Sequence, residues 1–117
     1  MSVTNLGGGA RVKLALHEHA TAQQYRELGV FVRYCIEQIE RELAPAHSWR
    51  VRIVPDRVYF GCEVVVRYGD DVVAANGVGF DGAVAGRDAF SKIESLLRAN
   101  HPSLELAPTC EAACGGR

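Results

Sequence analysis

Two histidines separated by one residue, in the sequence HEH from His17 to His19, are the first candidates for chemistry. In a β-strand, side chains two positions apart point to the same face, so the two imidazoles could share one metal ion. A metal site needs further ligands, and no carboxylate or cysteine lies at a spacing that would clearly complete the set. The sequence favours a polar strand end at HEH and predicts no metal site.

Four cysteines are a second source of chemistry, but they do not form the paired C-x-x-C pattern of a zinc site. Cys110 and Cys114 lie four residues apart in CEAAC, and on a helix this spacing would place both thiols on one face, where they could bind metal or form a redox pair. Their place in a tail of small residues favours thiols without a role. Cys35 and Cys62 fit apolar helix and strand positions, which predicts small core residues.

No motif of catalysis or cofactor binding is present. The glycine-rich stretch GVGFDG lacks the G-x-x-x-x-G-K-[ST] pattern of a phosphate loop, and no G-x-S-x-G occurs. A small enzyme or ligand binder would need polar groups that converge in a pocket. His17, Glu63 and Asp81 are scattered candidates for such groups. The sequence therefore predicts a non-enzymatic protein with no catalytic residue, cofactor or metal.

Basic residues are the more informative group, because guanidinium and ammonium groups can grip phosphates. Strand alternation predicts that Arg11, Lys13, Arg50, Arg52 and Arg67 share one solvated side of a sheet. Tyr59 falls on the same side, where its ring could stack on a base. Charges on an open face often serve only solvation, so two interpretations stay open. The predicted nucleic-acid site comprises Lys13, Arg33, Arg50, Arg52, Arg87, Lys92 and Arg98.

Composition limits the class of protein. The chain has 117 residues, 48% hydrophobic and 23% charged, which is typical of one globular domain. Its 13 basic and 14 acidic residues leave a net charge of −1, which does not favour strong non-specific binding to nucleic acid but permits a local basic patch.

No apolar run approaches the roughly 20 residues of a membrane helix, and the first residues lack the apolar core of a signal peptide. We expect a cytoplasmic protein.

Hydrophobic periodicity predicts the elements that position these residues. Residues 11–17 alternate as a half-buried strand. Thr21 and Gln24 form a capping box, and the apolar stripe behind it predicts a helix that ends near Ala44, before Pro45. The stretches 48–54, 58–68 and 72–75 predict an antiparallel meander. We expect a loop from Asn76 to Gly86, although its middle could extend the last strand, and a second helix for which Asp88 serves as N-cap or first-turn acid.

This β-α-β-β-β-α order predicts an α+β fold, a two-layer sandwich in which two helices cover one face of a sheet of about four strands. The predicted domain spans residues 11–101. Residues 1–10 and 102–117 are expected to be flexible termini.

The order resembles that of the ribosome hibernation-promoting factor family over roughly residues 11–100. Two stretches carry the resemblance, DDVVAANGVGFDGAVAGRDAFSKIESLLR and RELGVFVRYCIEQIERELAPAHSWRVRIV. The resemblance implies a fold akin to a double-stranded-RNA-binding domain, and binding to the small ribosomal subunit through basic residues along the helices. Carried over residue by residue, it implies rRNA contacts at Lys92 and Arg98, with Arg33 behind them.

Two functions thus stay open. The first is a ribosome-associated factor, or one that binds other structured RNA. The second is a protein-interaction or homodimerising module, because an open sheet edge invites pairing and Val65 is an apolar residue on the outward face.

Overall fold

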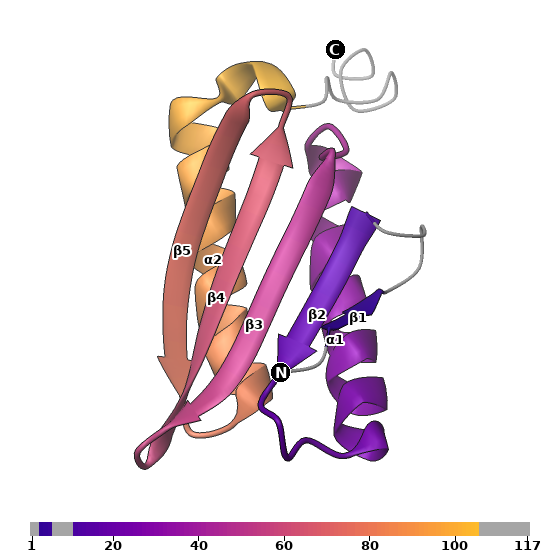
Figure 1. Cartoon of the computed structure of the whole chain (residues 1–117). Helices are drawn as coiled ribbons and strands as arrows, with labels where there is room; N and C mark the ends of the chain where they lie inside the picture. Colours follow the sequence, from indigo (N-terminus) through magenta and orange to yellow (C-terminus); the bar gives the residue numbers. More distant parts are fainter. Residues whose placement is uncertain (1–2, 6–10, 106–117) are drawn as a thin grey trace, which may run out of the picture.

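The computed structural model describes residues 3–5 and 11–105 (Figure 1). Its elements follow the chain as β1 (Val3–Asn5), β2 (Val12–Leu16), α1 (Ala22–Glu42), β3 (Ser48–Asp56), β4 (Tyr59–Tyr68), β5 (Asp71–Gly79), α2 (Gly82–Asn100) and a short 3₁₀ helix, η2 (Pro102–Leu104). The strands form one sheet in the order β1-β2-β3-β4-β5. β2 and β3 are parallel, and every other neighbouring pair is antiparallel.

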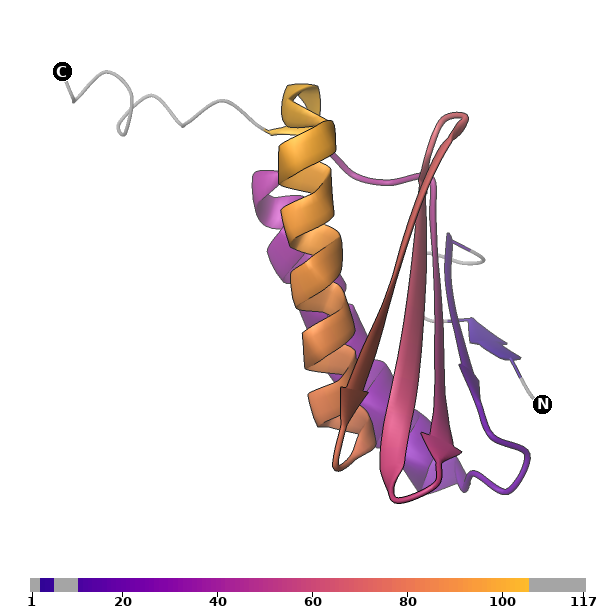
Figure 2. The same ribbon diagram turned by 90° about the vertical axis from the view of Figure 1, so that its left-hand side faces the viewer.

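The predicted α+β sandwich is confirmed. Figure 2 shows both helices on one side of the sheet, and among the described residues no helix covers the other side. The four main strands are those predicted. The three-residue β1 adds a fifth at the edge of β2, within the segment 1–10 that we expected to be flexible.

Alternation along β3 shows how the two faces separate. Trp49, Val51 and Ile53 are buried under the helices, whereas Arg50 and Arg52 point away and are exposed. Val64 and Val66 of β4 continue the buried face. Because side chains alternate along a strand, burial of the apolar residues on one face points the polar residues between them to the other face.

Helix α1 begins as the capping box predicts. The Thr21 hydroxyl accepts a hydrogen bond from the Gln24 amide at 3.1 Å, and the Gln24 side chain accepts one from the Thr21 amide at 2.8 Å. The stripe Val32, Ile36 and Ile39 is buried in the core. The helix ends at Glu42, shortly before Pro45, which cannot continue it.

Helix α2 begins six residues earlier than Asp88, so the predicted loop over 76–86 is wrong. β5 extends to Gly79 and the N-cap is Asp81, whose carboxylate accepts from the Val84 amide at 2.9 Å. The glycines serve close packing, because a Cβ built on Gly77 would lie 2.4 Å from the amide nitrogen of Ala89. Small residues let α2 and β5 approach each other. In the sequence, glycines that serve such close packing look the same as glycines that mark a loop, which explains the wrong prediction.

Candidate nucleic-acid interface

Three of the predicted basic residues lie together on the uncovered face of the sheet. The register places Lys13 of β2 directly opposite Arg50 of β3, with Arg52 two residues further along β3. They border a shallow hollow of about 510 Å³, which is lined by Lys13, Ala15, Arg50, Val51, Arg52, Glu63 and Val65. The walls of this hollow are cationic on the side of β2 and β3.

The charges in this hollow are only partly neutralised. Glu63 lies opposite Arg52, and its Oε1 is 3.9 Å from the Arg52 Nε. Lys13 and Arg50 have no ion pair or side-chain hydrogen bond within residues 3–5 and 11–105, and both are exposed. Like charges at directly opposite strand positions repel each other. An anion bound between Lys13 and Arg50 would relieve that repulsion.

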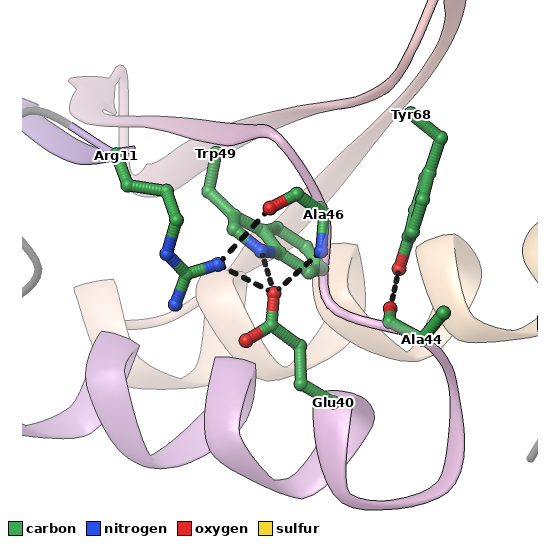
Figure 3. Close-up of polar contacts among 6 residues, drawn as sticks. All are labelled: Arg11, Glu40, Ala44, Ala46, Trp49 and Tyr68. Carbon is green, nitrogen blue, oxygen red and sulfur yellow. Dashed lines mark hydrogen bonds and ion pairs between the residues drawn. The ribbon is translucent and has the colours of Figure 1, made fainter.

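Two residues expected on this face are engaged in contacts with the backbone or the helix layer. Arg11 turns to the helix layer, where its Nη1 lies 2.7 Å from the Glu40 Oε2 and 3.3 Å from the Ala46 carbonyl oxygen (Figure 3). The prediction that Arg11 faces solvent with Lys13 is therefore wrong, since a partly buried carboxylate of α1 holds it. Arg67 does lie on the outward side of β4, where its Nε donates to the Gly69 carbonyl at 3.0 Å.

Glu40 is the most heavily bonded carboxylate in the described structure. One oxygen, Oε2, also accepts from the Trp49 indole at 2.8 Å and from the Ala46 amide at 2.9 Å. Burial alone would raise the pKa of Glu40, but the hydrogen bonds and the Arg11 charge outweigh burial and hold it below its ordinary value. This cluster joins α1 and the start of β3 to Arg11, the residue directly before β2, so its role is structural.

The two helical residues carried over from the family resemblance both hold partners within the chain. Lys92 donates to the Asn76 carbonyl at 3.0 Å and lies 3.3 Å from Asp88. Arg98 pairs with Glu42, with Glu94 at 3.0 Å and with Glu105 at 3.7 Å. These contacts would have to break, or be shared, before either residue could contact a phosphate.

Asp88 and Lys92 together bond the outer edge of β5. The Asp88 carboxylate accepts from the Val78 amide at 3.1 Å, while Lys92 donates to the Asn76 carbonyl at 3.0 Å. The Val78 amide, and then Lys92, hold the pKa of Asp88 below its ordinary value. The pair therefore satisfies part of a strand edge that would otherwise be open to another chain.

Arg33 and Arg87 are the free cations of the helix layer among the predicted residues. Both are exposed, and neither has an ion pair or side-chain hydrogen bond in the described part of the chain. Arg87 lines a groove of about 340 Å³ between α1 and α2, next to Tyr34. The predicted set is thus divided between opposite sides of the molecule, with Lys13, Arg50 and Arg52 on the sheet and Arg33, Arg87, Lys92 and Arg98 on the helices.

An exposed aromatic pair lies on the sheet side as well. The rings of Tyr59 and Phe80 are 5.3 Å apart and tilted by 41°. Tyr59 is 46% exposed and Phe80 is 78% exposed. Sequence reasoning placed Tyr59 on this face but missed Phe80, which fell in the predicted loop. The alternation of Gly77 and Gly79 with Val78 and Phe80 was the available signal, since it continues the period of a strand.

The scattered polar candidates for catalysis do not converge. His17 and Asp81 border a hollow of about 340 Å³ near the start of both helices, together with Gln24 and Glu27. Glu63 lies on the opposite face of the sheet. Burial raises the pKa of the Cys35 thiol to about 11 and that of Cys62 to about 12, so neither is a ready nucleophile.

The two histidines of the HEH sequence do not belong to a metal-ligand cluster among the described residues. His17 and His19 follow the end of β2, and the His19 amide donates to the His17 Nδ1 at 3.2 Å. Among the described residues, no group of three or more histidine, cysteine, aspartate or glutamate side chains could hold a metal ion. Cys110 and Cys114 lie outside the described residues. Within residues 3–5 and 11–105, no helix is both long and apolar enough to cross a membrane.

The fold defines a small α+β domain with a mixed sheet covered on one face by two helices. A ribosomal subunit interface protein from Coxiella burnetii shares it, with a TM-score of 0.60 and 11% identity over 75% of this chain and 93% of that chain. The N-terminal domain of Protein Y from Thermus thermophilus matches with a TM-score of 0.59 and 15% identity over 74% of this chain and 92% of that chain. The predicted resemblance in fold is therefore confirmed.

The sequence itself gives no corresponding match. No family profile matches the chain, and no curated protein matches it in sequence. The likeness of this chain to these two proteins is therefore a likeness of fold.

Proposed function

We propose that this protein is a non-enzymatic ribosome-associated factor that contacts rRNA through basic residues. The observation that supports the proposal most directly is the similarity of its fold to a ribosomal subunit interface protein over 93% of that protein's length. The exposed, unpaired cations Lys13 and Arg50 supply groups that can bind phosphate. A ribosome partner would place the protein in the cytoplasm.

Phosphate contacts make the expected binding strongly dependent on salt, because each neutralised phosphate releases counterions. The protein is expected to pellet with ribosomes at low salt and to remain in the supernatant at high salt. Sedimentation through a sucrose cushion over a salt series measures this, with the protein alone as the control for aggregation. Failure to pellet at low salt would remove the proposal.

The homodimer alternative has less support at the strand edges. β1 pairs with β2 at one edge of the sheet, and Asp88 and Lys92 bond β5 at the other. Light scattering at high protein concentration tests this alternative, since a monomeric mass would count against it.

A further inference from the structure

The uncovered face of the sheet carries an excess of positive charge that the helices do not share. Helices α1 and α2 contain six basic and six acidic residues, so the helical side is balanced. The outward positions of β2 to β5 hold four basic residues and two acidic ones, which are Lys13, Arg50, Arg52, Arg67, Asp56 and Glu63. A phosphate backbone is therefore attracted more strongly to the sheet than to the helices.

Two adjoining hollows, together called the trough, extend from this charge toward the aromatic pair, which lies two residues beyond Gly61 and Val78 on their strands. A second hollow of about 410 Å³ shares Arg52 and Glu63 with the cationic hollow, and continues past Gly61 to Val78. Among the described residues, no atom lies within 4 Å of a Cβ built on Gly61, so the floor there is open. From Val65, opposite Arg50, to Tyr59 is six residues of β4, or about 20 Å.

We propose that this trough binds a single-stranded segment of RNA, with phosphates at Lys13, Arg50 and Arg52 and an unpaired base against Tyr59 and Phe80. The inference rests on the proposed function, because it names the surface and the kind of RNA. Sheets that combine a cationic groove with exposed aromatic rings bind single strands in this way.

The aromatic pair is what selects a single strand over a duplex. Cations alone would attract any phosphate backbone. In a duplex the bases are stacked inside the helix and cannot lie on a side-chain ring, whereas unpaired bases can. Tyr59 and Phe80 lie two residues beyond Gly61 and Val78 and are exposed rather than buried in the core, so their rings are accessible to such a base.

The acidic residues of this face limit where the phosphates lie. Glu63 is 3.9 Å from Arg52, so Arg52 is partly compensated, and the strongest phosphate position is between Lys13 and Arg50. Asp56 pairs with Tyr59 in the register, so it repels phosphate near the aromatic end. A base, which is neutral, is the better occupant there.

Fluorescence anisotropy with the full chain tests the site. The probes are a labelled unstructured RNA of about ten nucleotides, a length that suits such sites, and an RNA duplex of equal charge. Arg50→Glu is expected to weaken single-strand binding by about tenfold and to lower the salt slope by about one. Phe80→Ala is expected to weaken single-strand binding by about tenfold and to leave duplex binding unchanged.

Matched variants on the other side of the molecule are the controls. Arg26→Glu and Arg41→Glu change the net charge as much as Arg50→Glu does, but lie at exposed positions of α1 outside the predicted site. They are expected to retain single-strand binding within about twofold, because at 0.15 M salt charges on the opposite side are largely screened. Equal losses from all three charge reversals, or a preference for the duplex, would overturn the assignment of the trough. Thermal melts verify that each exposed substitution leaves the fold intact.

Ribosome pelleting separates this inference from the proposed function. Suppose that the wild-type protein pellets with ribosomes, and that Arg50→Glu and Phe80→Ala match it in both pelleting and RNA binding. The assignment of the trough is then wrong and the ribosomal role stands. If the wild-type protein does not pellet but the RNA probe shows the expected variant effects, the trough stands and the ribosomal role falls. If Phe80→Ala instead abolishes a dimer and leaves RNA binding unchanged, the aromatic end is a protein contact and the RNA assignment is overturned.

Discussion

Replacing Gly77 with alanine is expected to lower the free energy of unfolding by about 3 kcal/mol, because a methyl group has no room there. A Cβ at Gly77 would lie 2.4 Å from the Ala89 nitrogen and 2.5 Å from the Ala85 carbonyl oxygen. Both atoms belong to the backbone of α2, so no side chain can rotate away. The helix would have to move off the sheet, which would open the core at this end. Urea denaturation measures the loss.

Gly61→Ala is the matched control on the neighbouring strand. Gly61 lies on the uncovered face, and within the described structure a Cβ there would meet nothing within 4 Å. Alanine is expected to leave the free energy of unfolding unchanged or to raise it by about 0.5–1 kcal/mol, since glycine loses more entropy on folding. Equal losses from both substitutions would show that the close packing of α2 on β5 is not the cause.

Glu40→Ala is expected to cost about 3 kcal/mol or more of unfolding free energy, since it leaves several partly buried donors without their acceptor. The Glu40 Oε2 accepts from Arg11, Ala46 and Trp49, and the Trp49 side chain is buried in the core. Glu37→Ala is the control on the same helix. Glu37 is exposed and has no side-chain partner in the described residues, so its replacement is expected to change stability by less than about 0.5 kcal/mol. Similar costs for the two substitutions would contradict a structural role for the cluster.

Glu40 also gives stability a dependence on pH whose sign can be stated. Its pKa is lower in the folded chain than the ordinary value of 4.5, so the folded state favours the ionised form. The stabilisation is fully present above the ordinary pKa and is lost as the pH falls through the folded pKa. The gap in unfolding free energy between the wild-type protein and Glu40→Gln is expected to narrow as the pH falls from neutral through this range. Urea denaturation at a series of pH values measures it, and a gap that widened toward acid would show that the sign is wrong.

The sequence predicted most elements because their signals are local. Thr21 and Gln24 lie three residues apart, and the alternation of Trp49, Arg50, Val51 and Arg52 is visible within four residues. The start of α2 was missed for a physical reason. Gly77 and Gly86 have close neighbours that are distant in sequence, Ala89 for Gly77 and Phe31 for Gly86, and no local pattern shows such a neighbour.

The sequence by itself determined the order of the six main elements, the buried face of each main strand and the positions of the basic residues along the chain. Only the tertiary structure decided which of those cations are free. Arg11 is neutralised by Glu40 across 29 positions and Arg98 by Glu42 across 56, whereas Lys13 and Arg50 become neighbours only through the register of β2 and β3. The reason is that an ion pair depends on distance in space, which the spacing of residues along the chain does not reveal.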